Sequence, residues 1–357
     1  MQKCPVCHHS FDTPFCPICG YDRSADAELS PTLSPLSGAV SSVSARSRER
    51  SALVSCPGCG GTAFSLEKET GLARCRVCGR THRVAPARRR IIAIAAGDAH
   101  TAVLYDDGTV RCVGKNNLGQ CNTGSWRNIV AIAGGFQSTY GLRADGTVVG
   151  VGNNRAGKSM VHTLKGIRSI CTGKGSQTIF LRMDGTAAAL GQNDNGECNV
   201  SDWRDLTAVA AGAGFSLGLR ADGTVLAVGY NEDGRCDTQS WRNITAIATG
   251  SWHSLGLRRD GTAVAAGADT SGRLQVSGWR DLVQIAAGRH FSAGLRADGT
   301  VCIASDHVSY HMAEGWTDIT AIAAGDSHLV GLRADGAVLA VGTNDDGQCN
   351  TDQLAEV

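Results

Sequence analysis

The chain has 357 residues, of which 42% are hydrophobic and 46 are glycine, and its formal net charge at pH 7 is +1. This length allows two or three ordinary domains, or one large repeat body with appendages. The hydrophobic content suffices for a core and the excess of glycine over aromatic residues indicates many turns, whereas the small net charge neither favours nor excludes an acidic partner.

The charged residues are unevenly distributed along the chain. Residues 1–90 contain 13 Lys and Arg against 7 Asp and Glu, whereas residues 91–357 contain 21 against 26. A basic front end makes nucleic acid a candidate partner of the N-terminal region. The apolar run IIAIAAG at 91–97 is too short to cross a bilayer, and the first cysteine pair leaves no room for a signal peptide. We therefore expect a cytoplasmic protein without membrane contact.

Two cysteine quartets, each built from two CxxC pairs, precede the rest of the chain. The first lies in CPVCHHSFDTPFCPICG (residues 4–20), with 8 residues between its pairs, and the second in CPGCGGTAFSLEKETGLARCRVCG (residues 56–79), with 15. A CxxC turn directs two thiolates at one ion, and two such turns complete a tetrahedron. The expected metal ligands are Cys4, Cys7, Cys16 and Cys19 in the first quartet and Cys56, Cys59, Cys75 and Cys78 in the second.

Each quartet resembles a zinc ribbon, so we expect a minimal ribbon at 1–20, a second ribbon at 56–83 and two structural zinc ions as cofactors. A closed site of four thiolates leaves no open position for catalysis, and domains this small need such an ion to fold. Iron in a rubredoxin-like site suits the same ligands, and disulfides or free thiols are further alternatives. Residues 21–55 are rich in Ser and poor in aromatic residues, which predicts a flexible linker.

A repeated phrase fills the chain from residue 88 onward. GLRADGTVLAVG at 218–229 recurs with small changes in seven copies, each preceded by an apolar segment that ends in glycine. Successive glycines are 38, 38, 39, 38, 38 and 37 residues apart. The aligned positions are Gly97, Gly135, Gly173, Gly212, Gly250, Gly288 and Gly325.

Each copy predicts a small antiparallel sheet of three apolar segments. Asp-Gly between apolar runs is a strong hairpin signal, because glycine accepts the positive φ of the turn. The segments are apolar on both faces, so neighbours must cover both sides. A sheet repeated at about 40 residues and buried on both faces is typical of a β-propeller blade, with the Ala-rich and Gly-rich segment innermost. We therefore expect an all-β, seven-bladed β-propeller at 88–357, preceded by the two ribbons.

The consensus GxxHSxGLxxDGxVxxxG, followed by GxNxxGQ, resembles the repeat of the regulator of chromosome condensation family. The resemblance covers residues 88–357, and it implies the same seven-bladed propeller. The third and sixth copies depart most from the pattern: the third has GKGSQ in place of GxxHS, and the sixth has SDHVSYH in place of the NxxGQC turn.

A tryptophan introduces five of the seven copies, and the tail supplies a substitute for the first. Leu164 takes the tryptophan position in the third copy, and the first copy has no such residue. The tail segment CNTDQL parallels CNTGSW at 121–126, which places Leu354 at the missing position. We expect the tail to pair as a strand with the first blade and so close the ring.

Three sets of repeated side chains are candidate functional residues. His100, His253 and His328 lie in separate GxxH turns, which favours packing and bonds to nearby backbone over metal binding. The cysteines at the QC position are expected to be small buried hydrophobes. These are Cys121, Cys198, Cys236 and Cys349. The Trp-Arg pairs on one rim predict packing between blades, with a partner surface as the alternative. These pairs are Trp126 with Arg127, Trp203 with Arg204, Trp241 with Arg242, and Trp279 with Arg280.

The sequence contains no Gly-rich phosphate loop, nucleophile elbow or convergent acid–base pair, so we expect no enzyme activity. We expect a non-catalytic, zinc-binding scaffold or adaptor, a monomer whose propeller binds one or more proteins. The resemblance implies guanine-nucleotide exchange on a small GTPase as the alternative. The family's namesake uses a hairpin wedge that projects from one blade, and the constant spacing of 37–39 residues leaves no room for a wedge here.

Overall fold

The computed structural model describes residues 2–3, 10–11, 59, 64–67, 72–83, 89–154 and 160–355. Contacts group the chain into two compact units, residues 1–34 and 35–357. In the first unit, β1 (Gln2–Lys3) and β2 (Ser10–Phe11) pair antiparallel. In the second unit, a three-stranded antiparallel sheet is formed by β3 (Phe64–Glu67), β4 (Leu72–Cys75) and β5 (Thr81–Arg83).

Seven further sheets, each of three antiparallel strands in chain order, follow in the described residues. The first strands are β6 (Ile91–Ala96), β9 (Ile129–Gly135), β12 (Ile167–Thr172), β15 (Leu206–Ala211), β18 (Ile244–Thr249), β21 (Leu282–Ala287) and β24 (Ile319–Ala324). The middle strands are β7 (His100–Tyr105), β10 (Ser138–Arg143), β13 (Gln177–Arg182), β16 (Phe215–Arg220), β19 (His253–Arg258), β22 (Ser292–Arg296) and β25 (His328–Arg333). The third strands are β8 (Val110–Gly114), β11 (Val148–Gly152), β14 (Ala187–Gly191), β17 (Val225–Gly229), β20 (Ala263–Gly267), β23 (Val301–Ala304) and β26 (Val338–Gly342).

The Asp-Gly steps form the predicted turns between the middle and third strands. In the second sheet, Gly146 has a φ of +77°, a conformation that L side chains rarely adopt. Asp145 Oδ1 accepts hydrogen bonds from the backbone N of Thr147 at 2.9 Å and from its Oγ1 at 2.6 Å. The carboxylate thus fixes the turn, and the same Asp-x-Thr bonds recur at Asp184, Asp222, Asp260 and Asp298.

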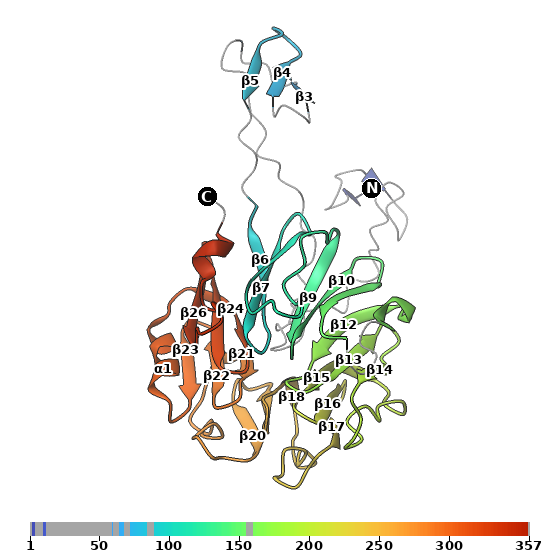
Figure 1. Cartoon of the computed structure of the whole chain (residues 1–357), viewed down its shortest axis with the longest axis vertical. Coiled ribbons are helices and arrows are strands. Elements are labelled where there is room, and N and C mark those ends of the chain that lie inside the picture. The colour runs from blue at the N-terminus through green and yellow to red at the C-terminus, as the bar shows by residue number, and fades with distance from the viewer. Residues whose placement is uncertain are drawn as a thin grey trace. The chain divides into compact units, whose positions relative to one another are not determined.

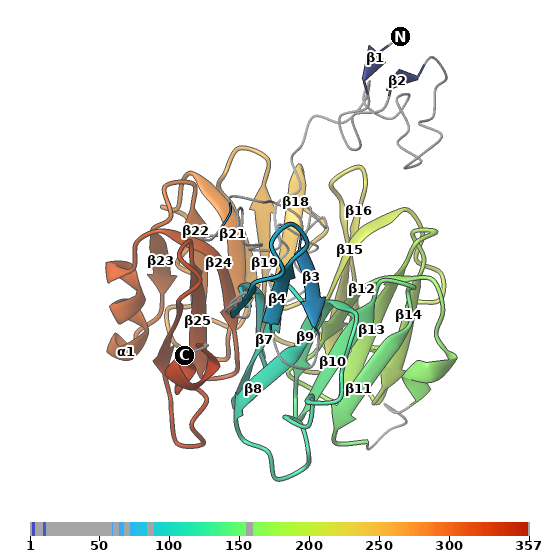
Figure 2. The ribbon, with the colours of Figure 1, turned by 90° about the horizontal axis from the view of Figure 1, so that it is seen from above.

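The first strands of the seven sheets form a closed ring. Each contacts the first strand of the following sheet, and β24 of the last sheet contacts β6 of the first. Figure 1 shows the sheets following one another around a common centre from teal to red, and Figure 2 shows the last sheet beside the first. Seven three-stranded sheets in a ring fit the seven blades of a propeller, numbered here 1 to 7 along the chain.

Apolar side chains on both faces of the blades pack against neighbouring blades. One buried cluster contains Cys171, Val209 and Ile247, which come from blades 3, 4 and 5. Small side chains of the first strands, among them Ala95 and Ala133, line the central channel. The all-β fold and the innermost position of the Ala-rich segments are therefore confirmed.

The C-terminal tail closes the ring in a different way from the strand that the sequence predicts. Residues Thr351–Leu354 form a 3-10 helix, η4, which contacts β8 and β26. Leu354 is 1% exposed and packs against Val103, Tyr105 and Val113 of blade 1. Tyr105 also donates a hydrogen bond from its hydroxyl to the Leu354 carbonyl at 2.6 Å. The expected strand pairing is wrong, because local i→i+3 bonds make this segment a turn like its counterpart at 121–126.

The sixth repeat, whose turn sequence departs from the pattern, has helical turns at that point. These are α1 (Val308–His311) and the 3-10 helix η3 (Met312–Gly315). Among the described residues, no helix combines the length and apolar character that a bilayer crossing requires.

Candidate interaction face and metal site

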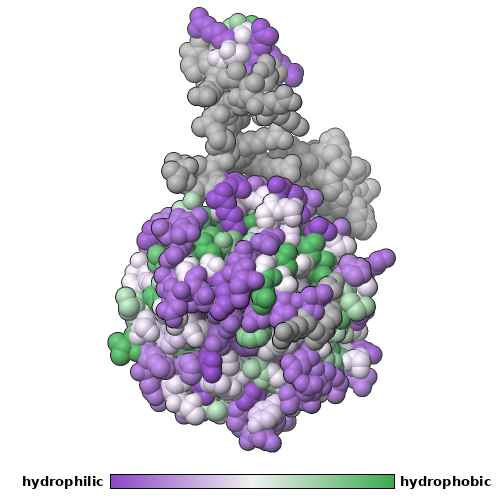
Figure 3. Space-filling model, viewed as in Figure 1, coloured by the Kyte–Doolittle hydropathy of each residue, from purple (hydrophilic) through white to green (hydrophobic). Residues whose placement is uncertain are grey.

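The loops between the first and middle strands of the blades meet at one end of the ring. Backbone hydrogen bonds join neighbouring loops, for example from Asp98 N to Gly135 O at 3.3 Å and from Phe136 N to Gly173 O at 3.2 Å. We call this end the loop face. Figure 3 shows one side of the molecule, on which polar residues alternate with small apolar patches.

Histidines of the GxxH turns connect adjacent blades beneath this face. His100 Nε2 lies 2.8 Å from Thr139 Oγ1 of blade 2, and this hydroxyl donates to the Gln120 carbonyl at 2.7 Å. The hydroxyl therefore accepts from the imidazole, which places the ring proton on Nε2. The same pattern joins His253 to Ser292 and the Arg273 carbonyl, and His328 to Thr101 and the Gln348 carbonyl.

These three histidines are buried and neutral rather than metal ligands. All three are 0% exposed. Burial lowers the pKa of His100 to about 4 and those of His253 and His328 to about 3. The predicted packing role fits this geometry, but the expected bond to nearby backbone is wrong, since each ring donates to a hydroxyl of the next blade.

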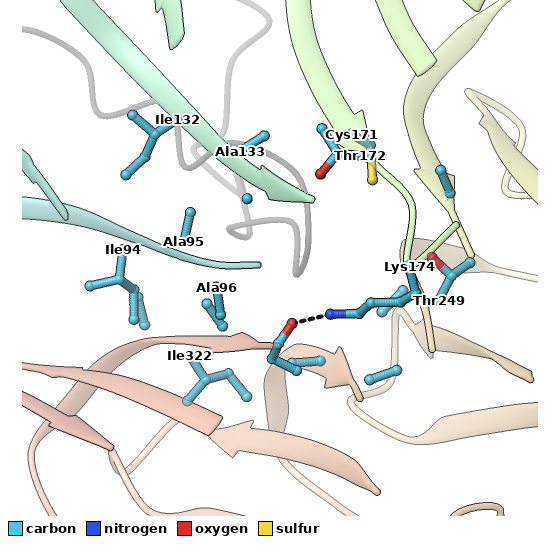
Figure 4. Close-up of a pocket in the computed structure, with 18 of the residues that line it drawn as sticks. Ile94, Ala95, Ala96, Ile132, Ala133, Cys171, Thr172, Lys174, Thr249 and Ile322 are labelled. Atoms are coloured by element: carbon cyan, nitrogen blue, oxygen red, sulfur yellow. Dashed lines mark hydrogen bonds between the residues drawn. The ribbon is translucent and has the colours of Figure 1, made fainter. Parts of the chain in front are cut away.

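A lysine from blade 3 reaches across the mouth of the central channel. Lys174 Nζ donates to the Ala324 carbonyl of blade 7 at 2.6 Å, as the dashed line in Figure 4 shows. Burial lowers the Lys174 pKa, which the charges of Asp326 and Asp98 partly offset. Burial also raises the Asp98 pKa, with a further contribution from Asp326. The cavity beside the lysine has a volume of about 40 Å³, which leaves room for a water or two but not for a substrate.

A tryptophan between two guanidinium groups marks the loop face at blades 5 and 6. The Cζ atoms of Arg289 and Arg273 lie 4.7 and 5.2 Å from the centroid of the Trp252 ring. Arg273 is fully buried, with bonds to the Ala268 and Arg289 carbonyls at 2.6 and 2.7 Å. The Arg289 side chain is 46% exposed, and its Nη1 lies 3.7 Å from Asp326 Oδ2. The Arg289 guanidinium is therefore an accessible cation positioned over the Trp252 indole.

Further rings extend this cluster towards the helical turns α1 and η3 of blade 6. The His290 ring centroid lies 5.7 Å from that of Trp252 and 5.3 Å from that of His307. Burial, followed by the charge of Arg289, lowers the His290 pKa. The helical turns also carry Val308 and Met312, which are 81% and 70% exposed. We call Trp252, Arg289, His290, His307 and these two apolar residues the blade 5–6 patch.

Most of this patch was not predicted from the sequence, although the aligned repeats contain a signal for it. The two positions after each aligned glycine vary freely between copies, and they supply Lys174, Trp252, Arg289 and His290. Variable loop positions on a regular scaffold are where binding residues are expected.

The tryptophans of the predicted rim are buried within the propeller. Trp126, Trp203, Trp241 and Trp279 are 4–7% exposed. Each following arginine is exposed, but its guanidinium folds back onto its own loop. Arg127 Nη1, for example, donates to the Gly124 and Trp126 carbonyls at 2.9 and 2.7 Å, and Arg204, Arg242 and Arg280 do the same in their loops. This geometry supports the packing role, and a partner contact by the arginines stays a prediction.

The recurring turn cysteines are less buried than the sequence predicts. Cys236 is buried, whereas Cys121, Cys198 and Cys349 are half-buried. Their sulfur atoms donate to nearby backbone carbonyls, as Cys121 Sγ does to Lys115 O at 3.3 Å. They therefore act as polar groups that fix the turn, rather than as hydrophobes alone.

Three cysteines of the second quartet converge in the described residues. The Sγ atoms of Cys59, Cys75 and Cys78 all lie within 4.8 Å of one another. Cys75 ends β4 and Cys78 lies in the following turn, where backbone hydrogen bonding lowers the Cys75 pKa to about 7. A cluster of thiols this close is a suitable donor set for a soft, tetrahedral metal ion. The other expected ligands, Cys4, Cys7, Cys16, Cys19 and Cys56, lie outside the described residues.

The propeller also matches a known repeat family. The profile of the regulator of chromosome condensation (RCC1) repeat matches residues 91–120, 206–235, 244–273 and 319–348, which lie in blades 1, 4, 5 and 7. The chain carries RCC1 repeats. The sequence resemblance is therefore confirmed, while no curated protein sequence matches the chain.

Solved structures share the fold of these RCC1 repeats at low identity. The CRINKLY WD40 ectodomain of the Arabidopsis thaliana receptor kinase ACR4 matches with a TM-score of 0.58 at 17% identity, over 71% of this chain and 98% of that one. The ectodomain of the Physcomitrella patens receptor kinase CR4 matches with a TM-score of 0.57 at 19% identity, over 71% of this chain and 74% of that one. Prp20p of Saccharomyces cerevisiae, whose structure is described together with its binding to Gsp1p and histones, matches with a TM-score of 0.55 at 17% identity. The match covers 74% of this chain and 85% of that one.

Proposed function

We propose that the chain is a non-catalytic, zinc-binding scaffold whose RCC1 propeller binds protein partners through the blade 5–6 patch. The observation that carries the proposal is the exposed Arg289 guanidinium over the Trp252 ring, in a cluster of rings that extends through His290 to His307. The helical turns that follow His307 carry exposed Val308 and Met312. Trp and Arg are enriched among residues that dominate binding energies, and Met and aromatic residues among interface residues generally.

Departure from the repeat pattern supports the same location. The helical turns α1 and η3 lie in blade 6, next to the loop that carries Arg289 and His290. On a shared fold, function resides in local sites rather than in the fold itself, which favours a location where this chain departs from its repeat. Prp20p, for which binding to Gsp1p and histones is described, gives a precedent for protein partners on a propeller of this kind.

The described cavities support a role without catalysis. Small-molecule sites typically have volumes of roughly 300–1,000 Å³ with convergent polar groups. The channel cavity measures about 40 Å³ and is lined mainly by alanine. An open groove of about 570 Å³ runs along blade 5, but its arginines and single carboxylate, Asp260, are the turn residues of the repeat. This groove includes Trp241 and Arg280, so it is the surface that the alternative rim interface would use.

For the metal, we propose zinc bound by Cys59, Cys75 and Cys78 together with Cys56, and a second ion in the first quartet. The convergence of three sulfur atoms supports the first site. Such an ion has a structural role, because four thiolates fill its coordination sphere. Iron remains the alternative for the same ligands.

A comparison of two arginine variants tests the interaction surface. Affinity capture from the source cell with the full chain is compared with capture by Arg289→Ala, on the patch, and by Arg280→Ala, in the groove. We expect a partner that wild type and Arg280→Ala retain and Arg289→Ala loses. A partner lost only with Arg280→Ala would place the interface at the groove, and equal capture by all three proteins would contradict both surfaces.

A further inference from the structure

In blade 1, the sulfur atoms of two cysteines each contact the chain segment that carries the other cysteine. Cys112 is the central residue of β8, and Cys121 lies in the turn that follows. Cys121 Sγ is 3.3 Å from the Lys115 carbonyl oxygen and 4.0 Å from that of Val113, the residue after Cys112. Cys112 Sγ is 3.7 Å from Thr123 Oγ1, two residues beyond Cys121. Each thiol also shifts the pKa of the other, upward for Cys112 and downward for Cys121.

This pairing distinguishes blade 1 from the other blades with a turn cysteine. Cys198, Cys236 and Cys349 make the same sulfur-to-carbonyl contact in their turns, at 3.1, 3.5 and 3.3 Å. The strand position of Cys112 is taken in those blades by Ala189, Ala227 and Ala340. Among the described blades, blade 1 alone therefore places a second thiol opposite the turn thiol.

A lowered pKa distinguishes Cys121 from the other turn cysteines. Both Cys112 and Cys121 are half-buried, so small oxidants can reach them. The side-chain hydrogen bond from Cys112 lowers the Cys121 pKa, whereas burial raises the pKa values of Cys198, Cys236 and Cys349 to about 11. Because the thiolate is the nucleophile, we expect Cys121 to react ahead of the equivalent cysteines of blades 3, 4 and 7.

We propose that Cys112 and Cys121 are a site of reversible disulfide formation, with a hydroperoxide as the oxidant. The Cys121 thiolate attacks one peroxide oxygen, the O–O bond breaks, and the departing hydroxide takes up a proton to give water, leaving a sulfenic acid on Cys121. The Cys112 sulfur then attacks the Cys121 sulfur, loses its proton, and displaces the sulfenic oxygen as a second water. Two thiols and one hydrogen peroxide thus give one disulfide and two waters, with two electrons passing from sulfur to peroxide.

The disulfide would tie the turn after β8 to the strand on which the tail packs. Val113 of β8 packs with Leu354, and Lys115 Nζ lies 3.4 Å from Oδ2 of Asp346 in the last turn. The bond would restrict the conformations of segment 112–121 in the unfolded chain. We expect the oxidised protein to melt at a higher temperature than the reduced protein.

Peptide mapping of the full chain tests the site. The reduced protein is treated with hydrogen peroxide, its remaining thiols are alkylated, and it is digested with trypsin, which separates Cys112 in peptide 112–115 from Cys121 in peptide 116–127. We expect a linked pair of these peptides, 2 Da lighter than their sum, which a dithiol reductant separates. Alkylation of both cysteines after peroxide treatment, or a link from Cys121 to any other cysteine, would overturn the proposal.

Matched variants in blade 4 provide the controls. Cys236→Ser should leave the link between peptides 112–115 and 116–127 intact, whereas Cys121→Ser should abolish it. Ala227→Cys places a thiol opposite Cys236, as in blade 1, and should create a second link. A link that survives Cys121→Ser, or an Ala227→Cys protein that folds by circular dichroism yet forms no second link, would show that the facing geometry is not the cause.

Discussion

At the scale of single residues, the aligned glycine at the end of the first strand is required in five of the seven blades by the ring three residues later. A Cβ on Gly97 would lie 2.0 Å from Cε1 of His100, and one on Gly212 would lie 2.0 Å from Cε1 of Phe215. The same overlap occurs whether the ring is an imidazole or a phenyl group. Packing of that ring over bare backbone therefore explains the glycine in blades 1, 4, 5, 6 and 7, whereas in blades 2 and 3 an added Cβ would meet Thr172 or the Gly212 carbonyl of the next blade.

Substitution of one such glycine should destabilise the propeller. We expect Gly97→Ala to lower the free energy of unfolding by about 1–3 kcal/mol, because the added methyl group forces the buried His100 ring to move. Denaturant unfolding followed by tryptophan fluorescence measures the change. Gly124→Ala is the matched control, since no atom lies within 4 Å of its added Cβ. Equal stability of the two variants would contradict the packing explanation.

The buried histidines make the stability of the fold depend on pH. Their pKa values in the folded protein, about 3 to 4, lie below the ordinary value of 6.5. The unfolded chain therefore binds more protons between these values, so the stabilisation is complete above pH 6.5 and is lost as the pH falls towards 4. Each histidine contributes a slope of up to about 1.4 kcal/mol per pH unit in this window.

Replacement of one histidine by the residue of a sister blade isolates this effect. Phe215 and Phe291 occupy the position of His253 in blades 4 and 6, so we expect His253→Phe to fold and to lose less stability between pH 6.5 and 4.5 than wild type. Urea unfolding at a series of pH values gives the comparison. Carboxyl groups titrate alike in both proteins, so a difference between their curves of unfolding free energy against pH reports on His253. Parallel curves would show that His253 is not neutral in the fold.

At the scale of elements, each blade joins its predecessor through a matched pair of large and small side chains. Trp126 lies over Gly141 of β10, where an added Cβ would come within 3.0 Å of the indole. The same Trp-over-Gly pair occurs at Trp203 with Gly218, Trp241 with Gly256, Trp279 with Gly294 and Trp316 with Gly331. In the two blades without a tryptophan, Leu354 and Leu164 take its place and the glycine becomes Val103 or Phe180.

The leucine of the tail should contribute to stability as a core residue does. We expect Leu354→Ala to lower the free energy of unfolding by about 2–5 kcal/mol, the range for truncation of a buried leucine. Leu118→Ala is the control, because that leucine is 43% exposed. Thermal melts measure both, and a Leu354→Ala protein as stable as Leu118→Ala would show that the tail does not fasten the ring.

Deletion of the tail should have a larger effect than the point change. Removal of residues 349–357 takes away η4 and with it the cover of β8, the outer strand of blade 1. An uncovered strand edge pairs with other chains, so we expect aggregates or dimers on a sizing column together with a lower melting temperature. A monomer that melts like the parent would contradict the closure described here.

At the scale of the whole molecule, metal binding and propeller stability should be separable. We expect elemental analysis to find about two zinc ions per chain, and Cys59→Ser to remove about one of them. The main thermal transition should not change, because the propeller residues form their own buried clusters without thiolate ligands. A folded protein without metal, or a melt that shifts with Cys59→Ser, would contradict this separation.

The regular blade lengths lead to an expectation about nucleotide exchange. In the described residues, the connections between strands contain no inserted hairpin; the one before β24 holds α1 and η3, and residues 160–163 before β12 form a 3-10 turn. We expect no acceleration of GDP release from small GTPases of the source organism, measured with labelled nucleotide. Acceleration by more than about 100-fold, equivalent to about 2.7 kcal/mol of barrier, would replace the scaffold proposal with exchange activity.

The sequence alone determined the features that depend on local spacing. Seven aligned glycines and the Asp-Gly turns predicted seven three-stranded sheets, because a hairpin is specified by the few residues that form it. The thiolate clusters could likewise be anticipated at Cys75 and Cys78, since a CxxC turn brings its own two sulfur atoms together.

Only the tertiary structure decided which residues meet across blades. Lys174 and Ala324 are 150 residues apart, and the rotation that closes the ring makes them partners. The same closure sets His100 against a hydroxyl of the next blade, whereas the sequence suggested nearby backbone. The tail was predicted as a strand and forms a 3-10 helix, and ring closure is what brings its Leu354 against Val103 and Tyr105 of blade 1. Contacts of this kind depend on how the blades pack side by side, and no periodicity within a single repeat encodes them.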